Sequence, residues 1–282
     1  MELTLANQII EVATDICRTV GARIRQEIFA PSGIRVSQKK ADELVTELDL
    51  WSEEQITLSV AKHFPSHLLL GEETYEKLVS EHKQDFVQLA SHGICWVVDP
   101  IDGTTNFVKG IPQVSISIGV LENGRREVGL VYDTVRDELF TAIRGQGAKL
   151  NGNPIKVSTV PTMKEAVLAT GFPYDHVAKW GFYKPAYESL FLEFRDIRRF
   201  GSAALDACWV ACGRFDAFFE YTLRAWDVAA GALIVEEAGG CCGNLAGDEF
   251  SIHAESFLFA PPALFSPALK IARAAHERAC KV

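Results

Sequence analysis

Near the start of the chain, apolar residues recur every three or four positions, a period typical of an amphipathic helix. The pattern predicts a long helix from Leu3 to about Ile28 with one buried face, and a second helix from about Thr46 to His63. The polar stretch between them, residues 31–46, is expected to form a loop or a short hairpin. The apolar positions that share the buried face of the first helix are Leu5, Ile9, Val12, Ile16, Val20 and Ile24.

Apolar runs later in the chain predict strands. Leu68–Leu70 reads as a short buried strand that ends at Gly71. Ile94–Val98 is a continuous apolar run, typical of a strand buried on both faces, and the run stops at Asp99. Three further runs, separated by turn residues, predict an antiparallel meander. Its expected strands are Val114–Leu121, Arg126–Tyr132 and Glu138–Ile143.

Beyond a turn at Asn151-Gly152, short strands alternate with helices, which is an α/β signature. We place a soft boundary near residue 148, between an α+β region (residues 1–148) and an α/β region (residues 149–282) that together form one compact unit. The expected strands lie near 166–170, 196–198, 217–220 and 257–259. The expected helices lie near 178–191, 203–212, 227–238 and 265–279.

The composition narrows the classes of function. Of 282 residues, 48% are hydrophobic and 23% are charged, which is ordinary for a globular protein with a sizeable core. The formal net charge is -9, so broad attraction to nucleic acid or to an anionic membrane is not expected. If the ligand is nonetheless an anion, a bound divalent cation would reverse the sign of the charge locally.

The start of the chain has no basic leader, and no run approaches the roughly 20 apolar residues of a membrane span, so we expect a soluble, unprocessed protein. The seven cysteines include no CxxC pair, which favours reduced thiols in a cytoplasmic protein. The adjacent Cys241 and Cys242 are compatible with a metal or redox feature, although small core or turn residues are favoured. The histidines lack zinc-site spacing and are expected at the surface or in packing.

The segment WVVDPIDGTTNF, residues 96–107, carries the chemistry. Asp99 and Asp102 follow the buried strand directly, and Pro100 forces the chain to turn between them. The two carboxylates can therefore converge on one point, where like charges about 4 Å apart repel unless they are protonated or bridged by a metal. Hard oxygen ligands of this kind suit Mg²⁺.

The residues after Asp102 add a second feature. Gly103, Thr104 and Thr105 supply a backbone that a ligand can approach closely, and N–H groups that can point at a phosphate if a helix begins there. Taken alone, an Asp-Gly pair is more often an ordinary turn, and threonines often cap a helix.

Further acidic and small-residue segments occur at ELVTELD (43–49), GEE (71–73), RRFGSAALD (198–206) with FFE (218–220), and WDVAAGALIVEEAGG (226–240). Singly, each has an ordinary alternative. Glu72 and Glu73 could be solvated loop acids, Asp227 a helix N-cap, and Glu220 a surface charge at the end of a strand. Together with residues 96–107, and in this order, they resemble the inositol monophosphatase family.

The resemblance implies a layered αβαβα sandwich of the inositol monophosphatase / fructose-1,6-bisphosphatase type. It implies hydrolysis of a small phosphate monoester, first of all inositol 1-phosphate, by metal-activated water, with two or three Mg²⁺ ions for which Mn²⁺ can substitute. Sensitivity to lithium and a homodimer are also implied. The implied metal ligands, most of them before the boundary near residue 148, are Glu72, Asp99, the Ile101 carbonyl, Asp102 and Asp227.

The family pattern also assigns roles to other positions. Asp49 would polarise Thr104, which would orient the attacking water, and Glu72 would be a further base. The N–H groups of Gly103 and Thr104 would hold phosphate oxygens. The implied substrate-binding positions are Asp102, Gly103, Thr104, Gly201, Ser202, Ala203, Glu220 and Asp227.

Two departures from the family pattern concern the substrate rim or its packing. Glu43 stands where the family has an aspartate, and FLFAPPALF (257–265) lacks the usual Asn-Pro. Because the metal ligands do not specify the alcohol, fructose-1,6-bisphosphatase, nucleotide 3'-phosphatase and histidinol-phosphate phosphatase activities stay open. An alternative of another class is a regulatory partner of the transcription machinery, as for some bacterial relatives.

Overall fold

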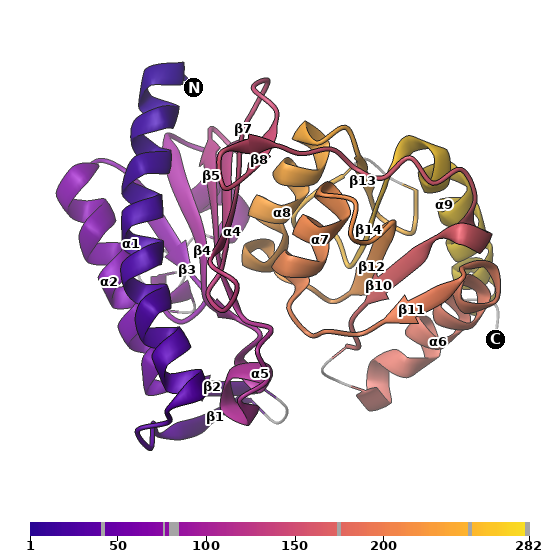
Figure 1. The fold of residues 1–282 in the computed structure, drawn as a ribbon, viewed down its shortest axis with the longest axis horizontal. Coiled ribbons are helices and arrows are strands. Elements are labelled where there is room, and N and C mark those ends of the chain that lie inside the picture. Colours follow the sequence, from indigo (N-terminus) through magenta and orange to yellow (C-terminus); the bar gives the residue numbers. More distant parts are fainter. Residues whose placement is uncertain (41–42, 76, 79–84, 174–175, 248–249, 280–282) are drawn as a thin grey trace.

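In a computed structural model that describes residues 1–40, 43–75, 77–78, 85–173, 176–247 and 250–279, helices and sheets stack in the order αβαβα (Figure 1). The fold class predicted from the sequence is therefore confirmed. Two sheets sandwich a central pair of helices, and a further pair covers the outer face of each sheet. The helical layers are α1 (Leu3–Phe29) with α2 (Glu47–His63), α7 (Ala203–Ala211) with α8 (Ala225–Glu237), and α6 (His176–Glu193) with α9 (Pro262–Ala279).

Within the described residues, the first sheet has seven strands in the order β3-β4-β5-β6-β7-β8-β9. β3 and β4 are parallel, and every later neighbour is antiparallel, which confirms the predicted meander. Before it, β1 (Val36–Lys40) and β2 (Glu43–Thr46) form the short hairpin that was one of the two predictions for this stretch. The strands of the sheet are β3 (Leu68–Gly71), β4 (Ile94–Asp102), β5 (Ser115–Glu122), β6 (Arg125–Asp133), β7 (Glu138–Ile143), β8 (Ala148–Leu150) and β9 (Asn153–Pro154).

The second sheet, in the part of the chain that the structure describes, has five strands in the order β11-β10-β12-β14-β13. β10 pairs in parallel with β11 and β12, and β14 pairs in the antiparallel sense with β12 and β13. The predicted alternation of strands and helices is confirmed, but the pattern did not predict β13, which is only three residues long. The strands are β10 (Val167–Thr170), β11 (Asp196–Arg198), β12 (Ala217–Tyr221), β13 (Cys241–Gly243) and β14 (Ser256–Ala260).

The continuous apolar run of β4 is buried on both faces, as predicted. Trp96 and Val98 belong to the apolar cluster beneath α1 and α2, whereas Cys95 and Val97 belong to the cluster beneath α7 and α8. Alternate residues of a strand point to opposite faces, so both faces of this strand need apolar side chains. A strand of this kind gives the residues at its end a rigid base.

Helix α8 packs unusually close to the first sheet. A Cβ at Gly119 would lie 2.7 Å from the Ala229 Cβ, and a Cβ at Gly129 would lie 2.8 Å from the Ala230 carbonyl oxygen. Glycine on the strands and alanine on the helix therefore allow this approach. The Ser117 hydroxyl also donates to the Trp226 carbonyl oxygen at 2.9 Å. These contacts fix the N-terminal end of α8 over the end of β4.

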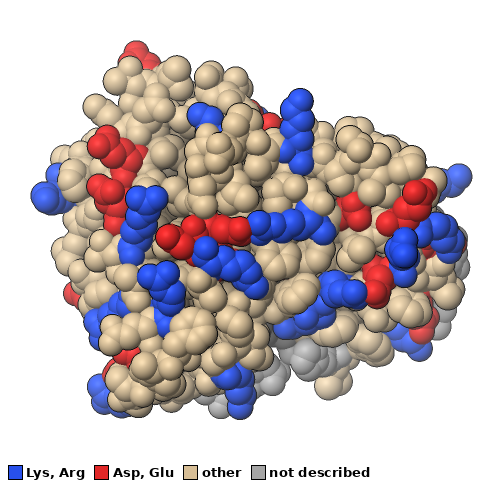
Figure 2. All heavy atoms as spheres, viewed as in Figure 1, with Lys and Arg blue, Asp and Glu red and all other residues tan. Residues whose placement is uncertain are grey.

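None of the described helices is long and apolar enough to cross a lipid bilayer. The described cysteines are free thiols, and Cys280 lies outside the described residues. Cys242 packs against the central apolar cluster, and its thiol contacts the Ala232 carbonyl oxygen at 3.4 Å. Acidic and basic side chains are interspersed on the face shown in Figure 2. The boundary proposed near residue 148 stays a prediction. The first sheet continues through β8 and β9 to Pro154.

Candidate metal centre and active site

A distortion at the end of β4 brings two carboxylates to one side. The apolar run stops at Asp99, as predicted from the sequence, whereas the strand β4 continues to pair with β5 as far as Asp102. Asp99 lies opposite Ser117 and Asp102 lies opposite Ser115, so three steps on β4 match two on β5. Residues three apart on a regular strand point to opposite faces, and the extra residue of a bulge reverses that relation. The irregularity at Pro100 therefore lets Asp99 and Asp102 converge.

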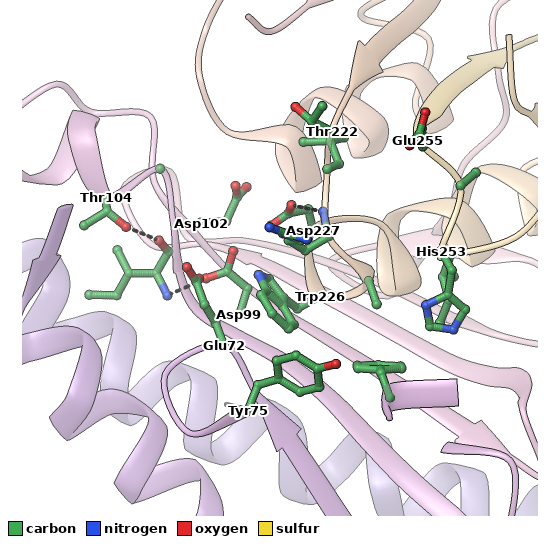
Figure 3. Close-up of a pocket in the computed structure, with 18 of the residues that line it drawn as sticks. Glu72, Tyr75, Asp99, Asp102, Thr104, Thr222, Trp226, Asp227, His253 and Glu255 are labelled. Carbon is green, nitrogen blue, oxygen red and sulfur yellow. Dashed lines mark hydrogen bonds between the residues drawn. The ribbon is translucent and has the colours of Figure 1, made fainter. Parts of the chain in front are cut away.

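Asp227 joins these two carboxylates from the other half of the chain. Oxygens of Asp99, Asp102 and Asp227 all lie within 4.8 Å of one another, and Figure 3 shows the three side chains around one opening. Asp227 is in the first turn of α8, where its carboxylate also accepts a hydrogen bond from the Arg224 N–H at 2.7 Å. The structure thus brings together residues that are more than a hundred positions apart in the sequence.

Asp102 is held by the N-terminus of α7. Its carboxylate accepts hydrogen bonds from the Ser202 hydroxyl, from the Ser115 hydroxyl at 3.0 Å, and from the N–H groups of Ala203 at 3.2 Å and Ala204 at 3.0 Å. Helix N-termini stabilise a negative charge. The predicted substrate positions Ser202 and Ala203 therefore orient Asp102 in this structure.

The carboxylates have raised pKa values, with burial as the largest cause. Burial and the neighbouring Glu72 and Asp102 raise the pKa of Asp99 well above its usual range. Burial and Asp102 raise the pKa of Asp227 to about 7. Burial also raises the pKa of Asp102, although its hydrogen bonds oppose this. Since a divalent cation would offset both the burial cost and the repulsion, this set of hard oxygen donors fits Mg²⁺.

Glu72 approaches the three aspartates from the end of β3. Its N–H donates to the Val98 carbonyl oxygen at 3.1 Å, so the backbone of Glu72 is tied to β4 just before Asp99. Its side chain lies beside Asp99 in Figure 3. After burial, repulsion from the Glu72 carboxylate is the largest cause of the raised pKa of Asp99. Of the two adjacent acids in the GEE segment, Glu72 is the one that lines the cavity.

Thr104 links the metal centre to α2. Its hydroxyl lies 3.4 Å from the Asp49 Oδ1 and 3.1 Å from the Ile101 carbonyl oxygen, both of which can accept its hydrogen bond. Asp49 is buried at the start of α2, where it also accepts from the Thr46 N–H at 2.8 Å, and burial raises the pKa of Asp49 to about 6. Thr104 begins α5 (Thr104–Lys109), directly after Gly103. Asp49 and Thr104 thus lie close enough for the predicted hydrogen bond.

A cavity of about 620 Å³ opens over this cluster. Its wall includes all five predicted metal ligands as well as Gly103 and Thr104. Four other predicted positions lie behind the wall. These are Asp49, which contacts Thr104, Ser202 and Ala203, which contact Asp102, and Gly201, whose carbonyl oxygen accepts from the Asn106 side chain at 3.3 Å.

Glu220 does not line this cavity in the structure. It lies on β12 beside Gly171, where any added Cβ would overlap its carboxylate. Burial, followed by repulsion from Asp206, raises the pKa of Glu220 well above its usual range, and Arg199 opposes that shift. The predicted contact between Glu220 and the alcohol therefore stays a prediction.

Several supporting residues were not predicted. The Asn106 amide donates to the carbonyl oxygens of Gln113 at 2.9 Å and Phe200 at 2.7 Å, which ties the DGTTN segment to the start of α7. Ser115 supports Asp102 from β5. Asn106 belongs to the conspicuous motif and could have been named from it. Ser115 gave no local signal, because its role depends on strand register.

The raised pKa values predict a pH-dependent stability for the metal-free protein. A carboxyl group whose pKa is higher in the folded state than in the unfolded chain, where it is about 4, stabilises the fold at low pH. That contribution is lost as the pH rises through the folded values of about 6 for Asp49 and about 7 for Asp227. In a chelator, the melting temperature should therefore fall between about pH 5 and 7. Asp227→Asn should flatten this fall, and an unchanged slope in that variant would contradict the assignment.

The chain belongs to the inositol monophosphatase family, whose model matches residues 5–281. It is 41% identical over 238 residues to the Nus factor SuhB of Escherichia coli, covering 84% of this chain and 85% of that protein. It superposes on the Thermotoga maritima IMPase with a TM-score of 0.83 and 30% identity, over 96% of this chain and 99% of that one. Members of this family are Mg²⁺-dependent phosphomonoesterases.

A more distant similarity is to IMPase-II of Staphylococcus aureus. Separate structures show that protein with inositol monophosphate and with 2'AMP. The complex with inositol monophosphate has a TM-score of 0.77 and 27% identity, over 96% of this chain and 97% of that one. The complex with 2'AMP has a TM-score of 0.79 and 28% identity, over 97% of this chain and 97% of that one.

Proposed function

We propose that this protein is a Mg²⁺-dependent phosphatase that hydrolyses inositol 1-phosphate to inositol and phosphate. The observation that carries the proposal is the convergence of Asp99, Asp102 and Asp227 within 4.8 Å, at the wall of a cavity large enough for a small phosphate monoester. Family membership and the inositol monophosphate complex of the S. aureus relative support it. We extend the proposal to a cytoplasmic location, a homodimer and inhibition by lithium.

In this proposal, Glu72, Asp99, the Ile101 carbonyl, Asp102 and Asp227 would hold the ions. When bound, Mg²⁺ neutralises the phosphate and lowers the pKa of a coordinated water. Asp49 would accept the hydrogen bond of the Thr104 hydroxyl and so direct the lone pairs of that hydroxyl toward the attacking water. The N-terminus of α5 presents the N–H groups of Gly103 and Thr104 to phosphate oxygens. Such a site catalyses mainly by positioning and charge stabilisation, so a covalent nucleophile is not required.

A nucleoside monophosphate is a second candidate substrate. Tyr75, Phe86, Trp226 and His253 line the same cavity next to the metal centre. Their rings contact one another, with centroid distances of 5.7 Å for Tyr75 and Phe86, 5.5 Å for Tyr75 and Trp226, and 5.0 Å for Phe86 and His253. Aromatic side chains bind bases by stacking. The 2'AMP complex of the S. aureus relative also favours this candidate.

A role with the transcription machinery is a candidate of another class, since the similar E. coli protein is a Nus factor. An intact carboxylate cluster argues against a purely non-catalytic protein, but both roles are compatible. Pull-down of RNA polymerase from native lysate by wild type and by Asp99→Asn would separate them. Equal recovery by both proteins would assign binding to a surface independent of catalysis, and recovery by neither would remove this candidate.

The assay that tests the proposed activity measures phosphate release from inositol 1-phosphate, fructose 1,6-bisphosphate, 2'AMP and adenosine 3',5'-bisphosphate, each with Mg²⁺ and with chelator. We expect inositol 1-phosphate to have the highest kcat/KM, and chelator to abolish release from every substrate. A higher kcat/KM for 2'AMP would favour the nucleotide candidate. No Mg²⁺-dependent release from any of the four would refute the proposed activity.

A further inference from the structure

We propose that Glu53 is a positioning residue that fixes Glu72 for metal binding, although Glu53 itself contacts neither the cavity nor a proposed ion. The inference rests on the proposed function, because it takes Glu72 to be a metal ligand. Glu53 lies on α2 one helical turn after Asp49, so both carboxylates point from the same face of the helix. It is only 1% exposed, and the sequence offered no reason to single it out.

The Glu53 carboxylate binds the backbone just after Glu72. It accepts hydrogen bonds from the Glu73 N–H at 2.8 Å and the Thr74 N–H at 3.0 Å, and a third from the Thr74 hydroxyl at 2.6 Å. Three donors converge on one side chain, and both carboxylate oxygens are used. A buried carboxylate is costly unless it is hydrogen-bonded in this way.

Gly71, the residue before Glu72, packs directly against the Glu53 carboxylate. A Cβ at Gly71 would overlap the Glu53 carboxylate, so only glycine leaves room for it there. The N–H of Glu72 donates to the Val98 carbonyl oxygen on the opposite side. Glu72 is therefore held between β4 and the Glu53 carboxylate, which leaves its backbone little freedom to turn the side chain away from Asp99.

Helix α2 thus supports the metal centre at two points. Asp49 reaches it through Thr104, and Glu53 reaches it through the backbone that carries Glu72. Partners that orient a ligand without touching the metal commonly change metal affinity about 10-fold to 100-fold when they are mutated. The same range is expected for Glu53.

The test is Mn²⁺ binding to the full-length protein without substrate, measured by electron paramagnetic resonance, alongside phosphate release with Mg²⁺. Glu53→Gln keeps the volume but replaces one acceptor oxygen with an NH₂ group that cannot accept from the N–H groups. We expect Mn²⁺ affinity to fall about 10-fold to 100-fold. Excess Mg²⁺ should then recover most of kcat. Glu54→Gln, at the exposed neighbouring position, is the matched control and should bind Mn²⁺ as wild type does.

Thr74 provides a second pair of variants that leaves Glu53 in place, at an exposed residue. Thr74→Val removes one of the three donors and should weaken Mn²⁺ binding by a smaller factor, whereas Thr74→Ser should restore it. Wild-type Mn²⁺ affinity in Glu53→Gln, with only a lower melting temperature, would overturn this inference and leave the proposed function intact. If wild type itself neither bound Mn²⁺ nor released phosphate, the proposed function would fail first.

Discussion

Asp99→Asn is expected to lower kcat/KM for phosphate release by at least about a thousandfold, since a metal ion stabilises transition-state charge by several kcal/mol. Asp99 lies close to Glu72, Asp102 and Asp227, and repulsion from each of these carboxylates raises the pKa of Asp99. Asparagine preserves the volume but removes the negative charge. The variant should therefore fold, and the measurement is phosphate release across a range of Mg²⁺ concentrations.

The stability of this variant provides an independent check. Without metal, Asp99→Asn removes the cost of ionising a carboxyl group in a buried acidic cluster, so its melting temperature in chelator should equal or exceed that of wild type. Mg²⁺ should raise the melting temperature of wild type but not that of the variant. Asp15→Asn, at an exposed position of α1, is the control and should behave as wild type in both experiments. Near-wild-type turnover in Asp99→Asn would contradict the assignment of this residue.

Gly103→Ala is expected to lower kcat/KM about a hundredfold, the loss typical of a displacement near 1 Å at a reacting centre. Gly103 has a φ of +99°, a conformation that disfavours side chains. A Cβ there would lie 2.9 Å from the Gln113 carbonyl oxygen and 3.2 Å from that of Gly201, and both are backbone atoms that cannot rotate away. The start of α5, with its proposed phosphate-binding N–H groups, would have to shift.

Gly145→Ala is the matched control for that substitution. Gly145 has a φ of +78°, but a Cβ there would meet nothing within 4 Å. Its cost should be limited to backbone strain of about 1–2 kcal/mol in the free energy of unfolding, with no change in kcat/KM. Gly103→Ala should show this strain and the steric displacement together. Urea denaturation and steady-state kinetics of both variants measure the difference, and equal kcat/KM values would show that the close contacts at Gly103 do not matter.

The elements of the fold follow closely from local patterns. The apolar period of α1, the continuous run of β4 and the turn residues of the meander each have a direct structural cause. Less predictable were features that depend on pairing between distant segments. The extension of β4 to Asp102 requires its register with Ser115 and Ser117, and β13 forms only because β14 provides an edge for it.

The candidate site shows the same division. The motif at residues 96–107 identified Asp99, Asp102 and Thr104 from spacing and residue type, and the family pattern added Glu72 and Asp227. Neither named three of the residues that hold these side chains or the backbone around them. Glu53, Asn106 and Ser115 bind groups 21, 94 and 13 positions away in the chain, respectively. Asn106 belongs to the motif and could have been named from it, whereas the roles of Glu53 and Ser115 depend on which segments meet in the folded chain.

The position of Asp227 has a consequence for the molecule as a whole. Asp99 and Asp102 extend from one sheet, whereas Asp227 is in the first turn of α8, the helix that lies between the sheets. A divalent cation shared by all three would act as a removable cross-link through the middle of the sandwich. Ion binding requires the arrangement of the layers that brings all three carboxylates together, so a substitution that lowers the population of that arrangement weakens ion binding in proportion. Substitutions deep in that seam, far from any substrate, should therefore shift the concentration of Mg²⁺ at which the protein is half saturated.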